Sequence, residues 1–368
     1  MIISFLLVIG PLIFIHEMGH YWVGRWFGVK ADVFSIGFGR EIGGWTDRRG
    51  TRWKIGWLPL GGYVRFAGDM SPASTPSREW LELPPEERAR TFQSKPLWQR
   101  FLIVLAGPLT NLVFAILVIC GFLLAAGEYR TPPVIDVVEP GSAAASAGLA
   151  PGDRITAVGG SRVDHFEDIG RLVILHPGEP LAISFVRDGQ ARRIVATPKA
   201  KVQTDKFGNE FRKGQLGIKT NRLVVEPVSL ARVIPTAIGQ TWTIVAMSVE
   251  GLGQIITGQR SVDELGGPLK IAKFSGEQAS LGWAAFISFV ALISINLGFI
   301  NLLPIPLLDG GHLLFYAIEA VRRKPLKPEA QEWAFKTGLA ALLALMIFVT
   351  LNDLASFGLW SKLGSLIG

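Results

Sequence analysis

The chain has 368 residues, of which 49% are hydrophobic and 18% are charged, and its mean hydropathy is +0.35. This composition excludes an ordinary soluble protein and indicates a membrane protein with a soluble insert. The net charge of +7 comes from basic residues that cluster beside apolar segments, without a basic stripe, so we expect no nucleic-acid partner. A single cysteine, Cys120, rules out an internal disulfide.

The first predicted span, about residues 1–24, contains the sequence His16-Glu17-Met18-Gly19-His20. Two histidines four residues apart lie about 40° apart around a helix, so both imidazoles can bind one metal ion. This is the H-E-x-x-H pattern of zinc metalloproteases, with two histidine ligands, Glu17 as general base and a third ligand from elsewhere. So short a pattern also arises by accident, but ionisable residues at bilayer depth are costly and usually face a polar site.

The same segment has no basic start and no small-residue cleavage site, so we interpret it as a retained span and not as a signal peptide. The loop after it is rich in Arg and Lys up to residue 95, which by the positive-inside rule places the loop in the cytoplasm. Within that loop, residues 33–66 predict a β-hairpin. Its tryptophans favour association with the membrane, and its free edge could pair with an extended substrate. An ordinary cytoplasmic hairpin is the alternative.

A second span is predicted over about residues 101–127, a run without charged residues. It contains a small-residue patch that ends in Asn111 and permits close approach of another helix. Asn111 either faces the metal site or bonds to a neighbouring helix. Residues 1–127 together form the predicted N-terminal membrane part.

Residues 131–200 change to short alternating strands and glycine turns. The order of strand, short helix, the sequence GLAPGDRI, strand, helix and two strands resembles a PDZ domain of the bacterial protease type, which implies a groove for an extended peptide or a chain end. A plain spacer domain is the alternative. Residues 201–283 are predicted to be a linker whose segment 233–249 is an amphipathic helix, since a fifth span there would invert everything downstream.

The C-terminal membrane part is predicted over 284–368, with spans at about 284–303 and 335–352. Because Pro304 and Pro306 cannot continue a helix, the third span must break before Asp309. A carboxylate at the end of an apolar segment needs a partner, which makes Asp309 our candidate for the third metal ligand. A helix cap is its alternative role. Four spans then put Asp309 and the histidine pair at the same depth, toward the cytoplasm.

In this order, the motifs resemble those of the site-2 proteases, which are intramembrane zinc metalloproteases, in their bacterial RseP-like branch but with a single PDZ domain. The matching stretches are HEMGH, FSIGFGR, PLGGYV, GPLTN, the PDZ-like insert and NLLPIPLLDGGH. The resemblance implies that His16, His20 and Asp309 bind Zn²⁺ and that Glu17 is the catalytic base. It further implies that Asn296 and Asn301 position the substrate near the metal.

We therefore expect a polytopic α-helical membrane protein with four transmembrane helices, a membrane-associated β-hairpin and an inserted α+β PDZ-like domain. The resemblance implies a protease of the bacterial inner membrane, surrounded by lipid, with the PDZ-like domain in the periplasm and the active site toward the cytoplasm. Its implied substrates are transmembrane segments of single-span proteins, such as anti-sigma factors or remnant signal peptides.

Two other functions compete with this reading. One is a non-catalytic adaptor that binds envelope proteins through its PDZ-like domain. The other is an ion or proton transporter, which the few intramembrane carboxylates and the lack of an inverted repeat of the spans argue against.

Overall fold

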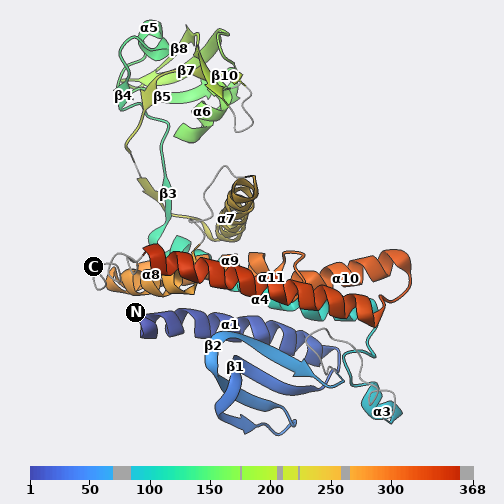
Figure 1. The fold of residues 1–368 in the computed structure, drawn as a ribbon. Helices are drawn as coiled ribbons and strands as arrows, with labels where there is room; N and C mark the ends of the chain where they lie inside the picture. The colour runs from blue at the N-terminus through green and yellow to red at the C-terminus, as the bar shows by residue number, and fades with distance from the viewer. Residues whose placement is uncertain (69–83, 175, 205–209, 223, 258–265, 357–368) are drawn as a thin grey trace, which may run out of the picture. The chain divides into compact units, whose positions relative to one another are not determined.

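The computed structural model describes residues 1–68, 84–174, 176–204, 210–222, 224–257 and 266–356. The chain divides into two compact units. The helical unit comprises Met1–Gly121 and Ile234–Gly368, and the inserted unit comprises Phe122–Val233. Figure 1 shows the elements of both units.

Four helices in the described part of the chain are long and apolar enough to cross a membrane, as the sequence predicts. They are α1 (Ile2–Trp26), α4 (Leu97–Ala126), α9 (Trp283–Asn301) and α11 (Pro328–Ser356). Most of their surface is not covered by the protein itself: only 17% of the apolar stretch of α11 is buried and 39% of that of α1. Exposed apolar side chains on this scale require a lipid environment.

The helical unit has four further helices in its described part: α3 (Pro85–Arg88), α7 (Leu230–Ile256), which begins in the inserted unit, α8 (Pro268–Ser280) and α10 (Asp309–Arg322). Helix α7 covers the predicted amphipathic segment, and it buries Ala237 and Thr241 while Trp242 is exposed. Helix α8 was not predicted. Its first backbone N–H groups, from Gly267 and Lys270, donate to the buried carboxylate of Asp353 on α11, so a distant residue caps it.

Helices α1 and α4 cross at very short distance where small residues meet. A Cβ atom on Gly19 would overlap with the Thr110 hydroxyl and the Ala106 carbonyl of α4. Glycine is therefore required here for the two backbones to approach. Because Gly19 directly precedes His20, this close crossing also places the histidine pair against α4.

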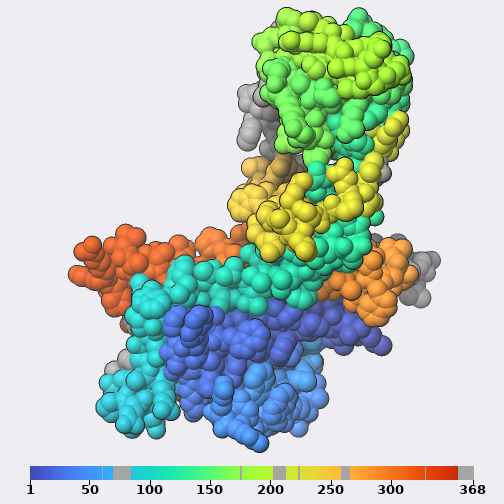
Figure 2. All heavy atoms as spheres, turned by 180° about the vertical axis from the view of Figure 1, so that it is seen from behind, coloured from blue at the N-terminus to red at the C-terminus, as the bar shows by residue number. Residues whose placement is uncertain are grey.

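The β-sheet of the helical unit lies along α1 on the opposite side from α4 (Figures 1 and 2). It consists of β1 (Ala31–Thr46) and β2 (Arg52–Phe66), which are joined by the turn at 47–50. Residues 31–36 pair with 62–66, and residues 41–46 pair with 52–56. Phe34 in β1 is buried and packs with Met18 and Tyr21 of α1, so the sheet is attached to the helix that carries the histidines.

The inserted unit is built on a four-stranded sheet in the order β6-β5-β7-β8. Its strands are β6 (Ser161–Arg162), β5 (Arg154–Val158), β7 (Leu181–Arg187) and β8 (Gln190–Ala196), and its helices are α5 (Ala143–Ala147) and α6 (Phe166–Ile174). As predicted, Ser142 caps α5 by accepting a hydrogen bond from the Ala145 amide, and Gly148 ends it with φ 85°.

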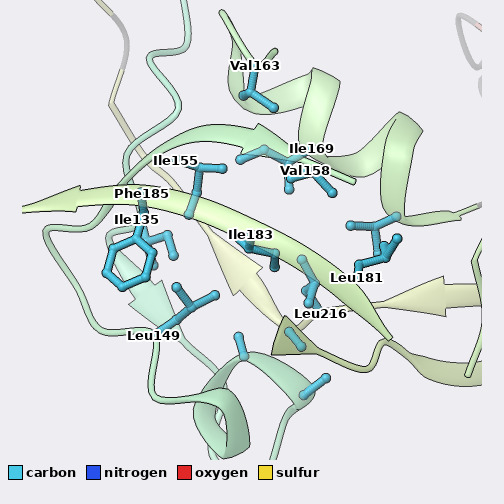
Figure 3. Packing of buried hydrophobic residues seen from close by; sticks show 14 residues of the cluster. Ile135, Leu149, Ile155, Val158, Val163, Ile169, Leu181, Ile183, Phe185 and Leu216 are labelled. Carbon is cyan, nitrogen blue, oxygen red and sulfur yellow. The ribbon is translucent and has the colours of Figure 1, made fainter. Parts of the chain in front are cut away.

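The described residues of the inserted unit also form three two-stranded ribbons. They are β3 (Glu128–Arg130) with β12 (Val224–Glu226), β4 (Val137–Val138) with β11 (Ile218–Lys219), and β9 (Lys199–Thr204) with β10 (Glu210–Gln215). Leu216, just before β11, is 4% exposed and lies in the same core as Ile183 and Phe185 (Figure 3). Leu216 and β11 thus pack with this unit from beyond residue 200, the predicted end of the domain. A two-residue strand with a distant partner leaves no local signal in the sequence.

A carboxylate buried in the inserted unit is paired with an arginine. Asp153 is buried, and its carboxylate accepts hydrogen bonds from Arg187 Nε and Nη2 at 2.6 and 2.7 Å and from the Ala150 amide at 2.9 Å. Burial alone would raise the pKa of Asp153, but these hydrogen bonds outweigh it and hold the pKa below the ordinary value of an aspartate.

We expect the inserted unit to lose stability in acid, because the unfolded chain binds a proton that folded Asp153 resists. A carboxyl with a lowered pKa contributes stability above its unfolded pKa of about 3.9 and loses it as the pH falls through its folded pKa. At neutral pH, Arg187→Met should lower the stability of this unit, since it leaves a buried carboxylate without its guanidinium.

Hydrogen exchange of the β5 and β7 amides in the full chain measures both effects. Arg162→Met is the matched control, because Arg162 pairs with Asp164 on the surface and its loss should change stability by less than about 1 kcal/mol. Equal exchange rates in Arg187→Met and wild type would contradict a stabilising role for the Asp153–Arg187 pair.

Candidate metal centre

The two histidines of the first helix point at one place in the interior of the helical unit. His16 and His20 are each 9% exposed, and their Nε2 atoms are 3.3 Å apart. One helical turn separates them, so the spacing seen in the sequence produces this convergence directly.

Asp309 brings a carboxylate to the same place from the other end of the chain. Its Oδ2 atom lies 3.1 Å from His16 Nε2 and 3.5 Å from His20 Nε2. The structure thus brings together the three residues that the sequence proposed as ligands, at the first residue of α10 and in the middle of α1.

The chain reaches Asp309 through a tightly folded segment after α9. Helix α9 ends at Asn301, as the two prolines require, and Leu307 has φ +96°. A positive φ in leucine costs about 1–3 kcal/mol and persists only where the surroundings impose it. The segment is closely packed, because Cβ atoms on Gly310 and Gly311 would overlap with the carbonyls of Leu303 and Ile305.

The three ligand atoms fit a tetrahedral zinc ion. Bonds of about 2.0–2.1 Å to nitrogen and oxygen give tetrahedral edges of about 3.3 Å, and the three edges here are 3.1, 3.3 and 3.5 Å. The buried Oδ2 of Asp309 faces both Nε2 atoms and can pair with an imidazole only where that nitrogen carries a proton. Two imidazoles and a carboxylate are a donor set that catalytic zinc sites use, and a cation would satisfy this oxygen.

The other ring nitrogen of each histidine is also engaged. His20 Nδ1 lies 2.9 Å from the carbonyl oxygen of Ile103, which can only accept, so Nδ1 carries the proton and Nε2 keeps its lone pair for a metal. His16 Nδ1 lies 3.3 Å from the side-chain amide of Asn111. Both partners belong to α4, which therefore orients the pair.

Glu17 lies beside the three ligand residues and is buried as well, with 6% exposure. It is in electrostatic range of His16, His20 and Asp309, and the backbone N–H of Val64 in β2 faces its carboxylate. Gly62 of the same strand packs on its Cγ, where an added Cβ would lie 2.9 Å away. A strand of the sheet thus borders the carboxylate that the sequence proposed as the base.

The two asparagines proposed to position the substrate are not joined to this cluster by a hydrogen bond in the described part of the chain. Asn296 accepts a hydrogen bond from Ser248 of α7 at 3.0 Å, and Asn301 is the last residue of α9 and is half-buried. Asn111, which the sequence left undecided, is the asparagine that contacts a histidine of the cluster. Ile103 and Gly62 were not foreseen, because no side-chain chemistry marks a carbonyl or a glycine.

Known proteins are similar to this chain along most of its length. A sequence profile of peptidase family M50 matches residues 4–345. Metalloprotease MmpA of Caulobacter vibrioides is 36% identical over an alignment of 392 residues. The alignment covers 100% of this chain and 98% of that protein. A relative from Agrobacterium fabrum, named as a zinc metalloprotease, is 42% identical over 360 residues and 96% of each chain.

Among solved structures, the PDZ domain of an SdrC-like protein from Listeria monocytogenes is similar to part of the chain. The match has 20% identity and a TM-score of 0.19, and it covers 26% of this chain and 90% of that one.

Four apolar helices and a match along most of the sequence define a membrane metalloprotease that depends on zinc. The chain belongs to peptidase family M50, the site-2 proteases. The family, the enzyme class and the zinc cofactor predicted from the sequence are thereby confirmed.

The packing of His20 on α4 leads to a test of the site. A Cβ on Gly107 would overlap with the ring of His20, including Nε2. Gly107→Ala should therefore displace His20 and weaken zinc binding by about tenfold or more. Gly121→Ala on the same helix is the matched control, because nothing lies within 4 Å of its added Cβ.

Zinc affinity of the two purified variants, measured by competition with a chelator, makes the comparison. Equal affinities in Gly107→Ala and Gly121→Ala would show that His20 does not hold the metal.

Proposed function

We propose that this membrane metalloprotease is an intramembrane endopeptidase that hydrolyses peptide bonds within the transmembrane segments of single-span proteins. Anti-sigma factors and remnant signal peptides are the substrate types that we assign to it. The observation that carries the proposal is the position of His16, Glu17 and His20. They are buried in a helix long and apolar enough to cross a membrane, and the carboxylate of Asp309 faces both imidazoles.

In this proposal His16, His20 and Asp309 hold the zinc, and Glu17 is the general base. Bound zinc supplies Lewis acidity, which polarises the scissile carbonyl and makes a water molecule more acidic. Glu17 accepts the proton of the attacking water and delivers it to the nitrogen of the leaving amine. Burial of Glu17 favours this shuttle, because the carboxylate exchanges its proton with the reactants and not with bulk water.

The substrate must be extended when it is cut, because the amides of an intact helix are already paired and shield the scissile carbonyl. We assign the holding of this extended segment to residues 62–66 of β2, which border Glu17, by addition of the substrate as a further strand. Asn296 and Asn301 lie in the last two turns of α9, the helix that leads to Asp309. We assign them hydrogen bonds to the unwound substrate backbone.

We further propose that the protein lies in a bacterial inner membrane with the inserted unit in the periplasm and the metal site toward the cytoplasm. The basic residues after α1 and those at 322–327, at and beyond the end of α10, support this orientation by the positive-inside rule. The inserted unit would then act as a PDZ-like module for a peptide or chain end in the periplasm.

Substitution of the base separates chemistry from metal binding. Glu17→Gln should keep about one zinc per chain and lose cleavage by a factor of about 10² to 10⁴, because the amide cannot accept the proton. Asp309→Ala should lose the zinc itself, since one of three ligands is removed.

The measurements are zinc content of the detergent-purified full chain and cleavage of a single-span protein in reconstituted vesicles. Cleavage retained by Glu17→Gln would refute the role of Glu17. Zinc retained by Asp309→Ala would show that Asp309 and the histidine pair do not form one metal site. A wild type without zinc or cleavage would favour the adaptor function.

A further inference from the structure

Asn111 occupies a position that the proposed mechanism leaves without a role. It is completely buried on α4, and its Nδ2 lies 3.3 Å from His16 Nδ1. Its Oδ1 is buried and has no hydrogen-bond partner within the described ranges. A buried amide oxygen without a partner is unusual and calls for an explanation.

The backbone at this position is held in place independently of the side chain. Ser294 of α9 donates a hydrogen bond to the backbone carbonyl of Asn111 at 2.8 Å. The main chain of α4 is therefore fixed against α9, while the amide of Asn111 can rotate about its own Cβ–Cγ bond. Rotation by 180° exchanges the places of Oδ1 and Nδ2.

The tautomer of His16 decides which orientation of the amide is favourable. A histidine that binds a metal through Nε2 keeps its proton on Nδ1, and this N–H needs an acceptor. An amide NH₂ group only donates. The Nδ2 of Asn111 therefore suits a His16 whose Nδ1 is an acceptor, which is the tautomer that carries its proton on Nε2. With Oδ1 in that place, the same side chain accepts from Nδ1–H and leaves Nε2 free for the metal.

The two histidines thus differ in how they are oriented. His20 is oriented by the carbonyl of Ile103, which is part of a helix backbone and can only accept. His16 is oriented by a side chain that can donate or accept. We propose that Asn111 is a positioning residue for zinc: its Oδ1 accepts a hydrogen bond from His16 Nδ1–H in the zinc-bound protein. This inference rests on the proposed metal site.

Two substitutions of similar size distinguish this role from simple packing. Asn111→Leu removes the acceptor and keeps the volume, so zinc should bind about 10- to 100-fold more weakly. Asn111→Asp presents an oxygen in either orientation, so its zinc affinity should equal or exceed that of the wild type. A packing role predicts the opposite order, because a carboxylate is far costlier than leucine in a buried apolar site.

The experiment is a chelator competition for zinc on the detergent-solubilised full chain, with thermal unfolding of each variant to verify its fold. Ser294→Ala is the matched control, since it removes the other polar contact of Asn111 without touching His16. We expect its zinc affinity to stay within about twofold of the wild type. The ¹⁵N shifts of labelled histidine in the zinc-bound protein report whether Nδ1 of His16 is protonated.

Equal zinc affinity in Asn111→Leu and wild type would overturn the inference and leave the metal site intact. A loss of zinc affinity in Asn111→Asp as large as that in Asn111→Leu would also overturn the inference, and so would an equal loss in Ser294→Ala. If the wild type bound zinc and Asp309→Ala bound it as tightly, the metal site itself would be wrong, and the role of Asn111 would fall with it.

Discussion

The carboxylate of Asp309 facing two imidazoles inside a bundle of apolar helices is the interaction on which the rest of the helical unit depends. A buried carboxylate is costly, and a cation beside it, either a metal ion or a protonated imidazole, compensates for the burial. The surrounding chain keeps this arrangement through rigid contacts. The prolines and the positive φ of Leu307 set the path of the chain into Asp309, and the carbonyl of Ile103 orients the ring of His20.

Close packing around the site depends on glycines, which have no side chain to keep neighbouring elements apart. Gly19 and Gly107 let α1 and α4 approach until His20 lies against the α4 backbone, and Gly62 lets β2 approach Glu17. In a lipid environment apolar burial does not drive helices together, so contacts between small residues and buried hydrogen bonds must do so. The same glycines therefore stabilise the bundle and place the reactive groups.

The inserted unit follows the physics of water-soluble proteins. Its core consists of apolar side chains packed on a sheet and two helices, as Figure 3 shows, and the buried carboxylate of Asp153 is matched by a guanidinium. Asp153 with Arg187 and Asp309 with two histidines are thus two solutions to the burial of a negative charge. The first is a closed pair, whereas the second leaves an oxygen for a metal.

The sequence by itself determined the chemistry of this protein and most of its helical elements. The spacing of His16 and His20, the uncharged runs and the caps of α5 are local patterns, and one helical turn or one span contains all the information that they need. Only the tertiary structure decided that Asn111 contacts a histidine of the site, that Asp353 caps α8, and that β11 pairs with β4 of the inserted unit. Each of these contacts joins residues far apart in the chain, and such pairings leave no periodicity or motif near either partner.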